Sequence, residues 1–239
     1  MFTGIIVGRG KLIEAKIFPG ASQIQIELPE QGELDLQIGA SVSVDGVCLT
    51  ATHIHGRLVT FDVMKETFSR TSFKQFTPGQ YVNIERAARD GAEIGGHPIS
   101  GHVDSTVEVV AIETPENNFV MTVKFPNDCS KYIFPKGYVS LNGASLTVCN
   151  VNKIANTLEV WLIPETLRLT TFGLKKVGDL INLEIERGTQ LAVDTMRNFL
   201  EERLGRYLPA FEAALETAGF SVDQLAGPAA PALPTPRTA

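Results

Sequence analysis

Apolar and polar residues alternate with a period of two along most of the first 188 residues. The clearest alternating segments are residues 23–28, 58–63, 81–85, 106–110, 119–123, 158–162 and 180–185. Neighbouring side chains of a strand point to opposite faces, so this pattern predicts half-buried β-strands. Glycine and proline, including Gly8, Gly10 and Pro78-Gly79, are interpreted as turns between the strands. About six short strands in each half of this region predict a small barrel or sandwich.

A nine-residue motif occurs twice, at residues 42–50 and 139–147, with five identical positions. Each copy is centred on a turn sequence, Asp45-Gly46 or Asn142-Gly143. Such pairs between apolar runs predict β-hairpins, because both turn residues tolerate a positive φ. Further matches follow each copy, so residues 1–96 and 97–188 are predicted to be two copies of one domain.

From Thr189 onward the apolar positions change to helical spacing. One face of the predicted helix carries Leu191, Ala192, Met196, Phe199, Leu200 and Leu204. This face needs cover, either from its own barrel or from another subunit. We expect residues 189–225 to form a helical segment, with a second short helix near residues 210–218. Residues 226–239 are rich in proline and alanine and are predicted to be disordered.

Composition narrows the choice of partners. A net charge of −6 and a pI near 5.3 argue against nucleic acid, and no apolar run is long enough for a membrane. The odd cysteine count (Cys48, Cys129 and Cys149) disfavours a disulfide framework, and no signal peptide is evident at the N-terminus. A cytoplasmic location is therefore expected. His97 and His102 fall on opposite faces of a strand, so no metal site is predicted.

The two halves differ at positions that carry chemistry. Cys48 aligns with Ser145, Ile5 with His102, Lys65 with Pro164, and Ser41 with Tyr138, whereas the turn glycines and Glu-Thr pairs are kept. Two similar pockets with unlike reactive residues suit a reaction in which two identical molecules play different parts.

Five motifs together resemble the riboflavin synthase family (alpha chain) over about residues 1–205. They are residues 1–5, 46–50, 95–102, 143–147 and 162–171. The resemblance implies an all-β fold of two tandem duplicated six-stranded Greek-key barrels with a C-terminal α-helix, assembled as a homotrimer. It implies a transferase that converts two 6,7-dimethyl-8-ribityllumazine molecules to riboflavin and 5-amino-6-(D-ribitylamino)uracil. No cofactor is implied, and lumazine synthase is a further candidate partner.

The resemblance also implies the site, with two lumazine molecules held between the N-terminal barrel of one subunit and the C-terminal barrel of its neighbour. The catalytic candidates are Phe2, Cys48, His102, Ser145 and Glu186. Phe2 would wall the reacting pair, His102 would move a proton, and Cys48 and Ser145 would hold or deliver a nucleophile. Glu186 stands where the family commonly has aspartate.

Substrate contacts are carried over for both barrels. The N-terminal pocket is expected to use Gly4, Ile5, Ile6, Ser41, Cys48, Leu49, Thr50, Asp62, Val63, Met64, Lys65, Glu66 and Thr67. The C-terminal pocket is expected to use Gly101, His102, Val103, Lys136, Ser145, Leu146, Thr147, Ile163, Pro164, Glu165, Thr166, Leu167 and Arg168.

Two other classes compete with the synthase. Lumazine-binding antenna proteins of luminous bacteria share the duplicated barrel but do not turn the substrate over. Flavin-barrel reductases carry an Arg-x-Tyr-Ser/Thr string, whereas the nearest sequence in this chain, Arg70-Thr71-Ser72-Phe73, lacks the tyrosine.

Overall fold

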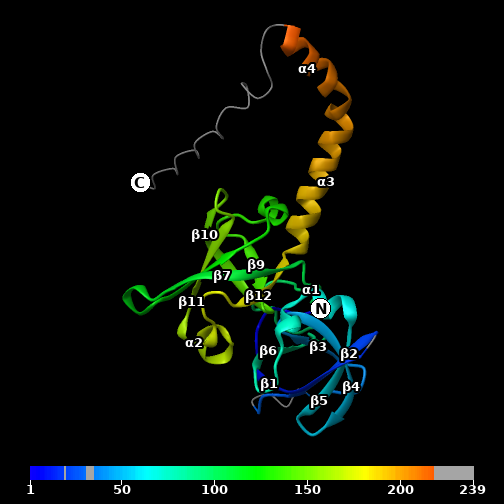
Figure 1. Ribbon diagram of the computed structural model, residues 1–239, viewed down its shortest axis with the longest axis vertical. Coiled ribbons are helices and arrows are strands. Elements are labelled where there is room, and N and C mark those ends of the chain that lie inside the picture. Colours follow the sequence, from blue (N-terminus) through cyan, green and yellow to red (C-terminus); the bar gives the residue numbers. More distant parts are fainter. Residues whose placement is uncertain (19, 31–34, 218–239) are drawn as a thin grey trace. The chain divides into compact units, whose positions relative to one another are not determined.

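The computed structural model describes residues 1–18, 20–30 and 35–217, and residues 1–190 form one compact unit. Its first half is a closed antiparallel barrel with the strand order β1-β2-β5-β4-β3-β6 (Figure 1). The strands are β1 (Gly8–Ile17), β2 (Ala21–Glu27), β3 (Ser41–Val44), β4 (Val47–His55), β5 (Leu58–Met64) and β6 (Tyr81–Arg86). The apolar residues of each alternating segment point inward and form one core.

The second half repeats this topology six strands later, as the internal repeat predicts. Its order, β10-β11-β8-β7-β12-β9, closes a second barrel with its own core. The strands are β7 (Ser105–Glu113), β8 (Phe119–Lys124), β9 (Tyr138–Leu141), β10 (Ala144–Asn152), β11 (Thr157–Leu162) and β12 (Leu180–Ile185). The predicted fold class, two six-stranded Greek-key barrels, is confirmed.

The interpretation of Gly8 and Gly10 as breaks between strands was wrong, because both lie inside β1. A β-carbon at Gly10 would come within 2.8 Å of the Ile26 side chain and 2.9 Å of the Ile84 side chain. Glycine there makes room for core side chains of the two neighbouring strands.

Each barrel also contains a short helix that the alternation did not predict. α1 (Lys65–Arg70) and α2 (Pro164–Leu169) follow β5 and β11, and each leads into a 3₁₀ turn, η1 (Ser72–Gln75) or η4 (Phe172–Leu174). Six-residue helices are too short to show a helical period. The first aromatic residue of each turn, Phe73 or Phe172, is fully buried in the barrel core. Two further 3₁₀ turns, η2 (Pro115–Asn117) and η3 (Asn127–Tyr132), flank β8.

The two barrels meet at the repeated hairpin turns. Gly46 and Gly143 approach so closely that a β-carbon on Gly46 would lie 2.6 Å from the Gly143 nitrogen. The side-chain amide of Asn83 donates to the backbone carbonyl of Asn142 (2.9 Å). The side-chain amide of its repeat equivalent, Asn182, donates to the backbone carbonyl of Asp45 (2.8 Å). Equivalent contacts in both directions define a local twofold relation between the halves.

The C-terminal part is helical, as predicted. It consists of α3 (Arg187–Leu204), η5 (Gly205–Tyr207) and α4 (Leu208–Thr217). The apolar stripe of α3 is solvent-exposed in the single chain, with Leu191 70 % and Phe199 54 % accessible. None of the helices in the described part of the chain is both long and apolar enough to cross a membrane. The tail predicted to be disordered, residues 226–239, lies outside the described residues.

Candidate functional site

The C-terminal barrel carries a cavity of about 180 Å³ beside the start of β10. Predicted substrate-contact residues from three segments of the chain line it. They are Gly4, Ile5 and Ile6, then Ser145 and Leu146, and finally Glu165 and Thr166 of α2. The Ser145 N–H donates to the Gly4 carbonyl over 2.9 Å, and Ile6 is part of the core of this barrel.

The N-terminal barrel repeats the arrangement with exchanged segments. The Cys48 N–H donates to the Gly101 carbonyl over 2.9 Å, and Val103 packs on the N-terminal core. The sequence assignment of these segments to their own barrels was therefore wrong. Gly4, Ile5 and Ile6 line the cavity of the C-terminal barrel, and Gly101 and Val103 contact the N-terminal barrel.

Two buried carboxylates hold the exchanged segments. Glu85 of β6 accepts hydrogen bonds from the Thr3 N–H (2.6 Å), the Thr3 hydroxyl (2.7 Å) and the Gly4 N–H (3.0 Å). Its equivalent Glu184 of β12 accepts from the Ser100 N–H (2.7 Å), the Ser100 hydroxyl (2.7 Å) and the Gly101 N–H (2.9 Å). Burial raises the pKa of Glu85, and the hydrogen bonds from Thr3 and Gly4 offset part of that rise.

The glycines of these segments are required by space as well as by backbone conformation. Gly4 and Gly101 have φ values of 78° and 81°, in the left-handed region. A β-carbon on Gly4 would lie 2.4 Å from the Ser145 β-carbon, and one on Gly101 would lie 2.5 Å from the Cys48 β-carbon. The backbone thus passes directly against each of the two reactive candidates.

Phe2 is buried, with 1 % of its surface accessible. Its backbone pairs with Ile99 through hydrogen bonds of 2.8 and 2.9 Å in the two directions. A β-carbon on Gly101 would lie 3.0 Å from the Phe2 ring, which places the ring beside the Gly101–Cys48 contact. Phe2 thus fixes the N-terminus against the segment that precedes the second barrel.

His97, rather than His102, contacts a reactive candidate. Its Nδ1 lies 2.6 Å from the Ser145 hydroxyl oxygen, and its ring stacks on Tyr138 at a centroid distance of 5.5 Å. Burial lowers the pKa of His97, and the nearby charge of Glu186 offsets part of that effect. His102 is exposed, and the hydrogen bonds recorded for it are made by its backbone.

Sequence reasoning weighed His97 as a metal ligand and as part of a family motif, and it missed this contact. The repeat aligns residue 3 with residue 100, so His97 has no equivalent in the first half of the chain. The only sequence signal was its place in a glycine-histidine string, and that signal does not specify a partner.

Glu186 caps the first turn of α3. Its carboxylate accepts from the Gly188 N–H over 2.7 Å and from the Thr189 N–H over 2.6 Å. Burial alone would raise its pKa, but the hydrogen bonds from Thr189 and Gly188 and the charge of His97 lower it overall. The carboxylate is therefore ionised at neutral pH, and its visible contacts stabilise the helix start.

The remaining predicted contact residues fall into two groups. Leu49 and Val63 belong to the N-terminal core, so their side chains point away from solvent. The others are exposed or half-buried: Ser41, Thr50, Asp62, Met64, Lys65, Glu66, Thr67, Lys136, Thr147, Ile163, Pro164, Leu167 and Arg168. Arg168 forms a surface ion pair with Glu165 at 2.5 Å. No cluster of metal-ligating side chains occurs among the described residues.

A family model described as the lumazine binding domain matches this chain twice, at residues 3–87 and 100–186. Riboflavin synthase of Escherichia coli (strain K12) is 44 % identical over 204 residues, which cover 85 % of this chain and 95 % of that protein. Riboflavin synthase of Mycobacterium bovis is 39 % identical over 189 residues, covering 78 % and 93 % of the two chains.

Solved structures share the fold at lower identity. LumP complexed with riboflavin superposes with a TM-score of 0.72 at 23 % identity, covering 77 % of this chain and 99 % of that one. LumP complexed with 6,7-dimethyl-8-(1'-D-ribityl) lumazine gives a TM-score of 0.69 at 22 % identity. Fold and family model together define a protein with two lumazine binding domains in tandem. Identity over most of both chains shows that this chain belongs to the riboflavin synthase family.

Proposed function

We propose that this protein is a riboflavin synthase. It transfers a four-carbon unit between two molecules of 6,7-dimethyl-8-ribityllumazine and releases riboflavin and 5-amino-6-(D-ribitylamino)uracil. The observation that carries the proposal is the 44 % identity with the Escherichia coli enzyme over 95 % of its length. Three free thiols favour a reducing compartment, and we place the reaction in the cytoplasm.

The duplicated site supports this reaction physically. We expect one related pocket in each barrel, so that two identical molecules are held by similar backbone groups. The pockets differ where Cys48 in one is replaced by Ser145 in the other. One lumazine therefore meets a thiol and the other a hydroxyl, which gives donor and acceptor different surroundings. Holding two reactants in a fixed orientation is itself a large source of acceleration.

The reactive candidates take distinct parts in this proposal. Neutral His97 accepts the hydrogen bond of the Ser145 hydroxyl and orients it toward the C-terminal pocket. Exposed His102 moves the proton that the donor's methyl group loses. Cys48 faces the ring of the second molecule from the N-terminal pocket. Glu186 fixes the start of α3, and its negative charge acts on His97.

We further propose that one complete site joins the N-terminal barrel of one subunit to the C-terminal barrel of another in a homotrimer. The exposed apolar stripe of α3, in particular Leu191, Met196 and Phe199, supplies a surface for association. Co-expression tests the arrangement. A Cys48→Ala chain, altered in the N-terminal barrel, and a Ser145→Ala chain, altered in the C-terminal barrel, each slow alone, should recover activity in mixed oligomers. Activity no higher than the average of the two parents would contradict a shared site.

The rival function is that of a lumazine-binding protein without turnover, which the LumP fold similarity raises. One assay separates the two. The purified protein is incubated with 6,7-dimethyl-8-ribityllumazine without added reductant or metal, and riboflavin is followed by its fluorescence after separation. Steady formation over many turnovers supports the synthase. A bound, unreacted lumazine would support the binding protein.

A further inference from the structure

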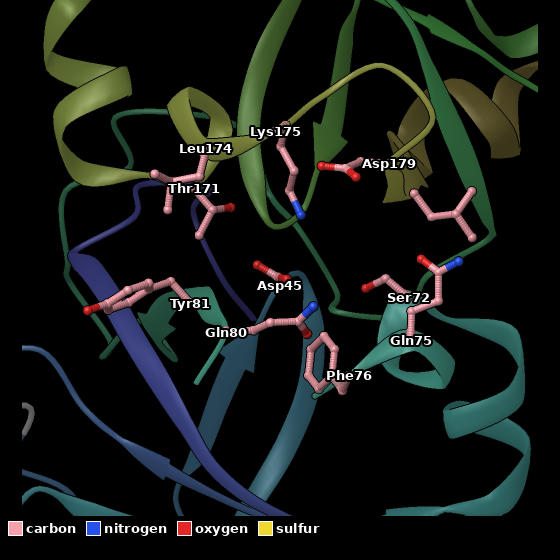
Figure 2. A pocket seen from close by; sticks show the side chains of 11 residues that line it. Asp45, Ser72, Gln75, Phe76, Gln80, Tyr81, Thr171, Leu174, Lys175 and Asp179 are labelled. Carbon is pink, nitrogen blue, oxygen red and sulfur yellow. The ribbon is translucent and has the colours of Figure 1, made fainter. Parts of the chain in front are cut away.

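A second kind of pocket lies between the two barrels, and none of the candidate site residues lines it. Its volume is about 280 Å³ (Figure 2). The walls come from the segments that follow α1 and α2 and from the first residues of β6 and β12. It is therefore a separate feature of the barrel–barrel contact.

The lining of this pocket follows the local twofold relation between the two halves. Apart from Asp45, its lining residues form pairs of repeat equivalents, among them Ser72 with Thr171 and Gln80 with Asp179. The backbone contacts are paired in the same way. The Ser72 N–H donates to the Asn182 side chain over 2.7 Å, and the Thr171 N–H donates to the Asn83 side chain over 2.7 Å.

Two buried hydroxyl groups in this pocket have no partner. Ser72 is 6 % exposed and Thr171 is 1 % exposed. Both hydroxyl oxygens are buried without a hydrogen bond to any described residue. Figure 2 shows both side chains at the edge of the space between the barrels. A buried hydroxyl without a partner is unfavourable, so these groups point to a molecule that binds between them.

The charged residues of the pocket, Asp45, Lys175 and Asp179, have uncharged equivalents in the other half of the chain. Lys175 stands where its equivalent is Phe76, and Asp179 where its equivalent is Gln80. The Lys175 ammonium acts electrostatically on Asp45, whose carboxylate also accepts the Asn83 N–H over 2.7 Å. Figure 2 shows the ammonium end of Lys175 directed toward the central space, on the side of Asp45.

These groups match a neutral molecule with several hydroxyl groups. A hydroxyl both donates and accepts, so it can donate to the Asp45 carboxylate, accept from Lys175 and pair with Ser72 or Thr171. The Phe76 and Tyr81 side chains supply apolar surface for a carbon chain. The volume is at the small end for ligand pockets, which favours a short chain. We propose that the pocket between the barrels is a binding site for a small linear polyol.

The test uses the full-length protein with ribitol as the probe and 1,5-pentanediol as the matched control that lacks the inner hydroxyls. Binding is measured by saturation-transfer NMR, with and without saturating riboflavin to occupy the two barrel pockets. We expect ribitol to bind in both conditions and 1,5-pentanediol to bind at least about tenfold more weakly, because it leaves two or more hydrogen bonds unmade.

Variants locate the binding. Ser72→Ala with Thr171→Val should weaken ribitol binding about tenfold or more. Thr52→Val removes a hydroxyl outside the pocket and should leave binding unchanged. Should the double variant fail to fold, Lys175→Phe is the alternative; it introduces the residue found at the equivalent position 76, fills the pocket and should abolish binding.

Three results would each overturn the proposal. They are equal binding of ribitol and 1,5-pentanediol, displacement of ribitol by riboflavin, and unchanged ribitol binding in the variants. A crystal structure soaked in ribitol that shows only ordered water on Ser72 and Thr171 would also count against it, because the hydroxyls would then have water as their partner.

Discussion

The substitution Asp45→Asn tests how a carboxyl group buried between the barrels affects stability. Burial raises the pKa of Asp45 from 3.8 to about 6, and the charge of Lys175 and the hydrogen bond from Asn83 offset only part of this rise. The folded protein thus keeps the proton to higher pH than the unfolded chain. The stability contributed by this group is complete below about pH 3.8 and is lost as the pH rises through about 6.

The size of the effect follows from the two pKa values. They differ by about two, and each unit corresponds to about 1.4 kcal/mol, so the full loss is about 3 kcal/mol. Between about pH 5 and about pH 8 the loss is about 1.5 kcal/mol. Asparagine keeps an oxygen that accepts the Asn83 N–H, and Asn142 already makes the equivalent contact with Asn182 over 2.8 Å. The variant should lack this part of the pH dependence.

Urea unfolding of wild type and Asp45→Asn at one protein concentration, at about pH 5 and about pH 8, measures the difference directly. The variant should gain about 1.5 kcal/mol relative to wild type between the two pH values. Contributions common to both proteins, such as that of Glu85, cancel. Asn142→Asp is the converse control and should add a new loss at high pH. Parallel pH profiles of wild type and Asp45→Asn would refute the reasoning.

Other predictions concern the site and the assembly. Gly101→Ala should lower both activity and melting temperature. Gly79 also has a positive φ but has open space around it, so Gly79→Ala should show the backbone cost alone. Equal effects of the two substitutions in thermal unfolding would contradict the close approach of Gly101 to Cys48. His97→Gln should lower turnover about tenfold or more and remove an ionisation from the pH profile of kcat, with KM little changed; an unchanged profile would count against its action on Ser145. Truncation before residue 189 should yield monomers in light scattering, and a truncated protein that stays oligomeric would disprove the role of α3.

The features that the sequence predicted well are local ones. The Asp45-Gly46 and Asn142-Gly143 turns are hairpins because both residues of each turn adopt a positive φ, with values of 44° and 83° in the first copy. The alternating segment from residue 180 to 185 forms β12, and its inward side chains, Ile181, Leu183 and Ile185, pack in the core of the C-terminal barrel. Because the sequence repeats, the prediction of one barrel in the first half also predicts a second barrel in the other half.

The features that the sequence did not predict depend on contacts between distant segments. Gly4 lies against Ser145, and Gly101 against Cys48, because Glu85 and Glu184 each fix a segment more than 80 residues away. No periodicity encodes such an exchange. His97 likewise reaches Ser145 across 48 residues.

The mass balance of a single reaction tests the central claim most directly. A known, limiting amount of 6,7-dimethyl-8-ribityllumazine is incubated with the purified full-length chain, and riboflavin and 5-amino-6-(D-ribitylamino)uracil are both quantified by chromatography. The proposed dismutation predicts one molecule of each product for every two of lumazine consumed. Riboflavin formed without an equal amount of the uracil, or lumazine recovered unreacted from the protein, would contradict it.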